Sequence, residues 1–547
     1  MFSGEKVHFY GAVDFNSVSR ILPYPTELGS ARFMSMSRHQ GQDDAVVYPY
    51  GSDAIGRSAD HPADKASKIN RGYPIPTGSK KPPIGTRTGQ KTPPGPTLVQ
   101  FFRLLPELLR DAPHVLLQLF QEYGDVVCLG DRRLRLFFIL SHPQHIKHVL
   151  QDNYLNFSKG SIYDELRMIH GDGLVTSEGD MWRRQRKQSQ PAFYHDHDEE
   201  YARIIVDVTT TMLDRWTAVA QSHRALDIRE EMRTLTLEIL LKCLFSTDLA
   251  PVAEALCPAL DLAEKHIHLA SRLNPLKPLL ERLPTPANLR FRRALRTIDH
   301  FAYGILQQRS QCPLHNGDFV SLLLAEEKNG GGLDDQHKRD AMITLVDSGF
   351  DSTAGAITWA WYLLSRNPGC ARTLQAELRD VLHGRTPTFE DLPQLRYTRM
   401  VVQETLRLYP SAWAIARTVI NDDEIDGYRI PAKSMIVISP YVAHRRVASW
   451  ENPEGFDPER FSPERSENRS QFAYIPFGGG PRLCLGIRFA LMEAELALAT
   501  IAQRWRLDLL PGPPIGIKPT ISLRPQSTIM MTLHSASGEG SDVVHAA

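Results

Sequence analysis

The chain has 547 residues, 42% of them hydrophobic, which is enough to bury the core of one large domain or of two ordinary ones. Lysine plus arginine and aspartate plus glutamate number 63 each, so no general positive field favours nucleic acid as a partner. The six cysteines show neither CxxC nor zinc-type spacing, which argues against a disulfide scaffold or an iron–sulfur cluster and suits a reducing compartment.

Signals for membrane insertion and export are missing from the sequence. No apolar run approaches the roughly 18 residues that a membrane span requires. The start of the chain, up to about Tyr50, lacks the charged-then-apolar order of a secretory signal. We therefore expect a soluble, cytoplasmic protein without a transmembrane anchor.

Residues 1–92 differ in composition from the rest of the chain. They are rich in Ser, Gly, Pro, Asp and Lys and carry few sustained apolar periods. Such a segment cannot bury enough apolar surface to offset the entropy that ordering costs. We predict a largely disordered N-terminal extension over 1–92, one catalytic domain over 93–535 and a flexible tail over 536–547.

Ordered structure is expected to begin at the turn Pro93-Pro94-Gly95-Pro96. Apolar periodicity then predicts a helix that Pro106 and Pro113 interrupt, two strands, and a second helix. The expected bounds of these four elements are Leu98–Gln121, Val126–Leu129, Leu134–Leu140 and Ser141–Asp152.

From Asp180 to about Asp380 nearly every segment has a helical pattern, with loops around 273–287, 313–317 and 329–332. After Glu404 the pattern becomes mixed. The later elements are expected at Glu424–Tyr428 and Met435–Ser439 (strands), Ile487–Trp505 (helix) and Pro519–Leu533 (a terminal strand pair). The predicted fold class is mainly α with a minor β-sheet (α+β).

A glycine-rich stretch, Phe477-Gly-Gly-Gly-Pro-Arg-Leu-Cys-Leu-Gly486, ends beside a cysteine and is followed at once by the last helical pattern. The glycines let the backbone wrap closely around the Cys484 sulfur, and the positive end of the next helix lowers the thiol pKa. Arg482 adds a cation that suits a carboxylate. These features indicate a metal-bound thiolate. The alternative is a small buried cysteine beside an ordinary loop.

A helix predicted over Leu333–Arg366, with Asp334 as its N-cap, contains Ser348-Gly-Phe-Asp-Ser-Thr353. Glycine next to an acid and two hydroxyls is poor helix chemistry, because Ser and Thr compete for backbone hydrogen bonds. Such a local conflict indicates function. The alternative is a polar stripe on a buried helix.

Three other stretches carry charge or aromatic residues at regular spacing. Glu404 and Arg407 face each other at i, i+3, a pair that is more often a solvated surface bridge. Trp182 and Arg186 lie one turn apart on a basic helix whose other cations fit a solvated face. His444 precedes Trp450, and no zinc motif includes it, so we expect it to pack and to form hydrogen bonds.

The cysteine stretch matches Phe-x-x-Gly-x-Arg-x-Cys-x-Gly and resembles the haem-binding loop of the cytochrome P-450 family. The other motifs occur in the order of that family, and the resemblance covers about residues 93–535. It implies heme b with Cys484 as the thiolate ligand of its iron. The other residues that it assigns to the cofactor are Trp182, Arg186, Arg417, Phe477, Arg482 and Gly486.

The resemblance also implies roles beyond cofactor binding. Glu404, Arg407 and Arg460 would form a buried charge network below the haem. Asp351, Ser352 and Thr353 would deliver the protons that cleavage of dioxygen needs. Ser352 stands where the family usually has Thr; without the methyl group its rotamer is less fixed, so proton delivery is expected to be looser and to leak peroxide. The residues expected to line the substrate pocket include Phe350, Ala412 and Trp413.

The resemblance therefore predicts a monooxygenase that inserts one atom of O2 into a hydrophobic small molecule such as a fatty acid, terpenoid or steroid. Electrons would come from a separate ferredoxin or flavodoxin with its NAD(P)H reductase, because the chain has neither cluster cysteines nor room for a flavin domain after residue 535. The exposed cations around Arg184 and Lys187 would steer that acidic donor. The alternatives are a haem-thiolate peroxygenase or isomerase and a haem-binding protein without catalysis.

Overall fold

The computed structural model describes residues 93–130, 137–248, 253–267, 283–312, 317–328 and 334–536. Several predicted segments lie outside these ranges: the extension over 1–92, most of the tail over 536–547 and the whole loop around 329–332. Parts of the loops around 273–287 and 313–317, and the start of the strand predicted at Leu134–Leu140, also lie outside them.

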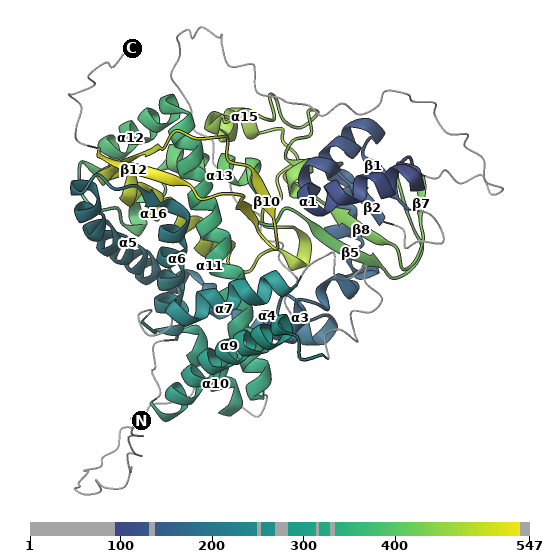
Figure 1. Ribbon diagram of the computed structural model, residues 1–547, viewed down its shortest axis with the longest axis horizontal. Coiled ribbons are helices and arrows are strands. Elements are labelled where there is room, and N and C mark those ends of the chain that lie inside the picture. The colour runs from purple at the N-terminus through teal and green to yellow at the C-terminus, as the bar shows by residue number, and fades with distance from the viewer. Residues whose placement is uncertain are drawn as a thin grey trace, which may run out of the picture. The chain divides into compact units, whose positions relative to one another are not determined.

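Helices make up most of the described chain (Figure 1). The longer ones are α1 (Leu98–Tyr123), α4 (Gly179–Ser189), α5 (Asp198–Gln221), α6 (Ile228–Phe245), α7 (Ala253–His266), α9 (Pro286–Gln311), α10 (Phe319–Lys328), α11 (Asp335–Arg366), α12 (Pro368–Leu382), α13 (Arg396–Leu408) and α16 (Ile487–Arg504). The short ones that the text uses are α2 (Pro143–Lys147), the π-helical turn η1 (His148–Asp152), α3 (Arg167–His170), α14 (Pro440–Ala443) and the 3-10 turns η8 (Pro458–Phe461) and η10 (Gly480–Arg482).

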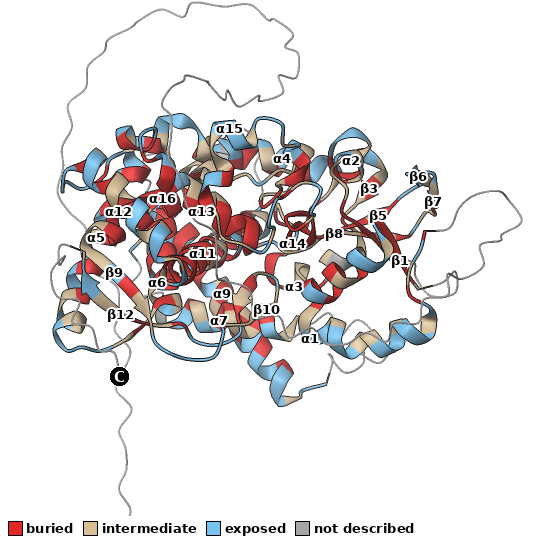
Figure 2. Cartoon of the chain, turned by 90° about the horizontal axis from the view of Figure 1, so that it is seen from above, coloured by how far each residue is buried: buried red, intermediate tan, exposed pale blue. Residues whose placement is uncertain are grey.

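Helix α11 forms the centre of the helical part. It packs against α6, α9, α13 and α16, and Figure 2 shows α11 itself as largely buried. Asp334 caps it as predicted: its Oδ1 accepts the His337 N–H at 2.8 Å. A helix that is apolar on most sides must lie inside a domain, and residues 341–346 are all buried.

A five-stranded sheet lies beside α1, in the order β1 (Val126–Leu129), β2 (Phe137–Leu140), β8 (Met435–Ile438), β5 (Ile415–Val419) and β3 (Phe157–Ser158). The pair β2–β8 is parallel and the other pairs are antiparallel. Alternate residues contribute to two different apolar clusters, Val126 and Cys128 to one and Val127 and Leu129 to the other. Both faces of these strands are therefore covered.

The structure corrects several predicted bounds. The single strand expected at Glu424–Tyr428 is a hairpin of β6 (Asp423–Ile425) and β7 (Tyr428–Ile430), because Asp426 and Gly427 adopt positive φ angles of 56° and 75°. The expected terminal pair is two separate pairings: β10 (Ile517–Pro519) with β11 (Leu523–Pro525), and β12 (Met530–Ser535) with both β9 (Trp505–Leu509) and β4 (Leu226–Asp227). Strands β3, β4, β5 and β9 were not predicted.

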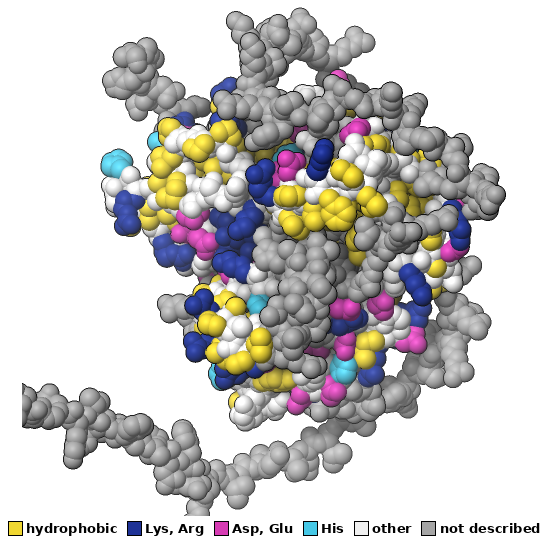
Figure 3. All heavy atoms as spheres, turned by 45° about the vertical axis from the view of Figure 1, so that its right-hand side comes forward, with side chains coloured by type: hydrophobic (Ala, Val, Ile, Leu, Met, Phe, Trp, Pro, Cys, Tyr) yellow, Lys and Arg dark blue, Asp and Glu magenta, His cyan; other side chains and the backbone are white. Residues whose placement is uncertain are grey.

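The charged surface agrees with the balanced composition. On the face drawn in Figure 3, basic and acidic side chains are interspersed with apolar ones. Among the described residues, no helix is both long enough and apolar enough to cross a membrane.

Candidate active site

Cys484 lies between η10 and α16 in a loop that closes on itself. Its N–H donates to the Phe477 carbonyl at 3.0 Å, and Gly486 is the N-cap of α16. Gly480 has a φ of +65°, and a Cβ on it would lie 1.8 Å from the carbonyl oxygen of Leu150 in η1. The glycines therefore let the loop pack directly on the backbone of η1.

The Cys484 side chain is accessible although protein atoms surround it. Burial raises the pKa of its thiol above the usual range, while the Gly486 amide and the Arg186 cation act in the opposite direction. The predicted lowering of the thiol pKa by the amide at the helix end is thus present, but burial outweighs it. A metal cation bound to the sulfur would favour the thiolate. An accessible sulfur inside the fold can bind a ligand.

One face of α11 is accessible in the middle of this otherwise buried helix. Ser348 is exposed, and Ser352 and Gly355, four and seven residues later, are partly exposed. Gly349 lies on another face, because a Cβ on it would lie 2.3 Å from a methyl carbon of Leu240 in α6. Gly349 therefore allows α6 to pack closely against α11, whereas Ser348 and Ser352 lie on the accessible face.

Cations gather beside the cysteine loop. The Arg186 Nη1 donates to the Leu483 carbonyl at 2.9 Å and so ties α4 to this loop. Arg186 and Arg482 both stack on the buried ring of Trp182, at 5.9 and 4.4 Å from its centroid. The Arg482 Nη1 also donates to the Ser177 carbonyl at 3.1 Å.

Lys159 belongs to the same group, and sequence reasoning missed it. It is buried, and its Nζ donates to the carbonyls of Leu174 (3.1 Å) and Val175. Burial, and then the nearby Arg482 and Arg417, lower the pKa of its ammonium to about 6. A single lysine after a two-residue strand matches no sequence motif for a binding site. Only its burial in the structure singles it out.

Glu178 is the carboxylate that contacts these cations, 3.7 Å from the Arg482 Nη2. Glu178 also acts on the Lys159 ammonium, and Arg417 lies near both Lys159 and Arg482. Like charges held together in a buried place repel each other unless an anion compensates them. The group therefore fits a ligand that carries carboxylates.

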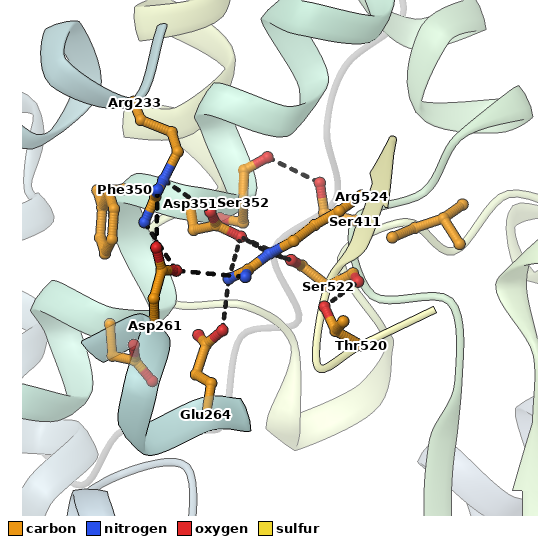
Figure 4. A network of polar contacts seen from close by, with 12 residues as sticks. Arg233, Asp261, Glu264, Phe350, Asp351, Ser352, Ser411, Thr520, Ser522 and Arg524 are labelled. Carbon is orange, nitrogen blue, oxygen red and sulfur yellow. Dashed lines mark hydrogen bonds and ion pairs between the residues drawn. The ribbon is translucent and has the colours of Figure 1, made fainter. Parts of the chain in front are cut away.

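Asp351 is buried on α11 and is surrounded by cations (Figure 4). Its Oδ2 accepts hydrogen bonds from the Ser522 hydroxyl (2.6 Å) and the Arg524 Nε (2.9 Å). Its Oδ1 lies 3.3 Å from the Nε of Arg233 and 3.5 Å from the Nη2 of Arg229, both on α6. Burial alone raises the pKa of the Asp351 carboxyl, but the Arg524 guanidinium and the Ser522 hydroxyl outweigh it and hold this pKa below its usual range.

The two hydroxyls after Asp351 bond back to the helix. The Ser352 Oγ donates to the Ser348 carbonyl at 2.8 Å, and both Ser352 and Thr353 approach the Gly349 carbonyl at 3.2 Å. These hydrogen bonds fix the side-chain rotamer of Ser352, which lacks the methyl group that restricts the rotamer of a threonine.

The three predicted pocket residues lie in different surroundings. Phe350 is buried, with its ring 5.6 Å from the Arg233 guanidinium on the α6 side of the helix. Ala412 is exposed, and the Trp413 indole donates to the Thr520 carbonyl at 2.8 Å. The Ser411 hydroxyl donates to the Ser352 carbonyl at 2.7 Å, which places this turn beside α11. The assignment of all three to a pocket stays a prediction.

The structure brings Glu404, Arg407 and Arg460 together in the core. Glu404 on α13 accepts from the Nε and Nη2 of Arg407 at 2.7 and 2.8 Å, and from the Nε of Arg460 of η8 at 3.0 Å. All three side chains are nearly inaccessible. His444 is no ligand: its Nε2 accepts the Ile475 N–H at 2.8 Å, and burial lowers the pKa of its imidazole to about 3.

Comparison with known proteins identifies the family. The model of the family described as Cytochrome P-450 matches residues 93–533. The chain is a member of the cytochrome P-450 family. It is 38% identical to cyclooctatin synthase of Streptomyces melanosporofaciens over 73% of this chain and 87% of that protein. It is 34% identical to pentalenene oxygenase of Streptomyces avermitilis over 68% of this chain and 82% of that protein.

A solved structure shows the same fold. The crystal structure of the cytochrome P450DA heme domain matches with a TM-score of 0.72 at 22% identity, over 82% of this chain and 98% of that one. As a cytochrome P-450, the protein is a monooxygenase that uses heme b with a cysteine thiolate ligand and acts on a hydrophobic small molecule. The residues present fit this cofactor, because an accessible cysteine and an excess of cations lie together.

Proposed function

We propose that Cys484 is the thiolate ligand of the haem and that the cations beside it bind the haem propionates. The observation that carries this proposal is the accessible Cys484 in a loop that Arg186 contacts. Arg482 of the same loop lies near Lys159 and Arg417, so that cations gather beside the cysteine. Arginine and lysine N–H groups are strong donors to carboxylates. When bound, the haem supplies the iron at which dioxygen is activated.

Asp351 and Ser352 supply protons to the reacting oxygen in this proposal. Ser352 lies on the accessible face of α11, and Asp351 precedes it on the adjoining face. A hydroxyl that faces the reaction chamber can pass a proton, and a carboxylate behind it can restore that proton from water. The chain's own contribution is thus to hold one hydroxyl in place and one acid within reach.

The proposed substrate is a terpenoid-like hydrocarbon or its alcohol. Besides the two relatives above, the chain is 34% identical to cyclooctat-9-en-7-ol 5-monooxygenase of Streptomyces melanosporofaciens, over 81% of this chain and 94% of that protein. By its name, that enzyme is a monooxygenase that acts at position 5 of an unsaturated alcohol. Relatives that match over so much of their length support a substrate of the same class.

Spectral titration of the haem-loaded protein tests this substrate class. We expect cedrol, a cyclic terpenoid alcohol, to bind at least about tenfold more tightly than palmitate, an acyclic acid of similar carbon number. Tighter binding of palmitate would contradict the proposal. Consumption of NADPH that rises on addition of cedrol, with product formed, would distinguish a monooxygenase from an isomerase or a haem carrier.

A separate acidic protein supplies the electrons in this proposal, docking on the exposed face of α4. Arg183 is paired with Asp180, whereas Arg184 and Lys187 are exposed on the same helix, and Arg186 of that helix contacts the cysteine loop. Complementary charge on a donor would speed its association there.

A further inference from the structure

Four elements meet at a buried cluster of charged side chains around Asp351 (Figure 4). Helix α7 contributes Asp261 and Glu264, α11 contributes Asp351, α6 contributes Arg233, and β11 contributes Arg524. Glu264, Asp351 and Arg233 are each less than a tenth exposed. Charges buried to this degree are stable only when their partners are correctly placed.

Arg524 is the residue that joins the carboxylates of this cluster. Its Nε donates to the Asp351 Oδ2 at 2.9 Å and to the Ser522 Oγ at 3.1 Å. Its Nη2 lies 2.9 Å from the same Asp351 oxygen and donates to the Glu264 Oε2 at 2.5 Å. Its Nη1 reaches the Asp261 Oδ1 at 3.4 Å. The Nη2 is therefore shared between Asp351 and Glu264.

We propose that Arg524 is a positioning residue that orients the Asp351 carboxylate for proton delivery, and that Glu264 competes with Asp351 for its Nη2. This inference rests on the proposed role of Asp351. A guanidinium is planar and has a fixed fork of donors, so its Nε and Nη2 together set the orientation of the carboxylate that they share. When Glu264 is ionised it draws the Nη2 to itself; when Glu264 is neutral, both donors serve Asp351.

The charges around Glu264 decide when this competition begins. Asp347 and Asp351 face it from α11, Asp261 lies on its own helix, and Arg524 approaches from β11. Asp347 is itself paired with His170 of α3 at 2.5 Å, and Arg233 of α6 is paired with Asp261 at 3.0 Å. Burial first, and then Asp347, raise the pKa of the Glu264 carboxyl to about 8, although Arg524 lowers it. In this proposal, the competition for the Arg524 Nη2 therefore sets in as the pH rises into mild base.

The test measures how far dioxygen is reduced by the haem-loaded full chain without organic substrate, with a ferredoxin and its NADPH-dependent reductase. Peroxide release uses one NADPH and one proton per O2, whereas complete reduction to two waters uses two NADPH and two protons. Peroxide formed per NADPH consumed thus rises when proton delivery fails. We expect this ratio to rise about twofold in the wild type between about pH 7 and pH 9, and to stay flat in Glu264→Gln.

Variants of Arg524 separate positioning from structure. Arg524→Ala is expected to raise the peroxide ratio at every pH, and Arg524→Lys to restore it in part, because one ammonium replaces the charge but not the fork. Arg309→Lys is the control: this arginine, like Arg524, is largely withdrawn from solvent (6% and 12% of the side chain exposed) and pairs with Asp318 away from the cluster. A second readout is infrared absorption: raising the pH from about 6 to 9.5 removes a protonated carboxyl band in the wild type, and Glu264→Gln lacks this band.

The outcomes distinguish this inference from the proposed role of Asp351. If Asp351→Asn leaves the peroxide ratio unchanged, both the role of Asp351 and the inference are wrong. If Asp351→Asn raises the ratio while the Arg524 variants match Arg309→Lys, the inference alone is wrong. A wild-type ratio that does not change with pH, or the same titrating infrared band in Glu264→Gln, would refute the competition by Glu264.

Discussion

Replacing Glu404 by alanine should destabilise the protein more than most single substitutions. Its two oxygens accept four hydrogen bonds, two from Arg407, one from Arg460 and one from the Asp457 N–H. The truncation leaves both guanidinium groups without their carboxylate in a place that water does not reach. Breaking a buried ion pair in this way costs about 3–5 kcal/mol. Glu404→Gln keeps one acceptor oxygen, and we expect a smaller loss.

The assay combines thermal unfolding with the haem content of the purified protein. Because the network lies between α13 and the segment that leads to the cysteine loop, we expect a fall in Tm of several degrees and incomplete haem loading for Glu404→Ala. Asp207→Ala is the control: Asp207 pairs with Arg203 at 2.9 Å, but both side chains are more than 60% exposed, and such pairs contribute about 0–1 kcal/mol. A fully loaded Glu404→Ala with an unchanged Tm would refute the reasoning.

Three further predictions follow from the site. Gly480→Ala should abolish haem loading, because its Cβ would lie 1.8 Å from the Leu150 carbonyl at a φ of +65°; full loading would contradict this. Folded Glu264 holds its proton up to about pH 8, while the unfolded chain releases it near 4.5, so the folded state binds more protons between these values and loses stability as the pH rises. The Tm of the wild type should therefore fall relative to Glu264→Gln over this range, and parallel curves would contradict it. Arg184→Glu and Lys187→Glu should each slow reduction by the ferredoxin roughly tenfold at low salt and flatten its salt dependence, as stopped-flow kinetics would measure; unchanged kinetics would exclude docking there.

Matched variants control for these experiments. Gly124→Ala also places a side chain at a positive φ, +94°, but meets no atom within 4 Å, so it should keep its haem. Arg203→Glu reverses an exposed charge on α5. It should leave the reduction rate nearly unchanged if the face of α4 determines docking.

Local patterns predicted the parts of the fold in which neighbours in sequence decide the structure. The period of apolar residues and the cap at Asp334 were enough for α11. The hairpin after Asp422 was missed, because its strands are three residues each and the pattern of so short a segment is ambiguous. Strand β5 exists only through its pairing with β3 and β8, which no local signal encodes.

The same contrast between local patterns and contacts of distant residues holds for the site. Cys484 and Asp351 stood out because their neighbours break local rules for helices and loops. The partners of Asp351 did not, because Arg524 lies 173 residues further along the chain and Arg229 lies 122 residues before it. Lys159 was missed for the same reason: its chemistry comes from burial and from two distant arginines, not from its own segment.

The most direct test of the account is the absorption spectrum of the dithionite-reduced, carbon monoxide-bound protein. Wild type is compared with Cys484→Ser and with Cys312→Ser, which changes the other exposed cysteine among the described residues. The account predicts a strongly red-shifted Soret band in wild type and Cys312→Ser, and its loss in Cys484→Ser. A band at the position of a histidine-ligated haem in wild type, or a red-shifted band that survives in Cys484→Ser, would contradict it.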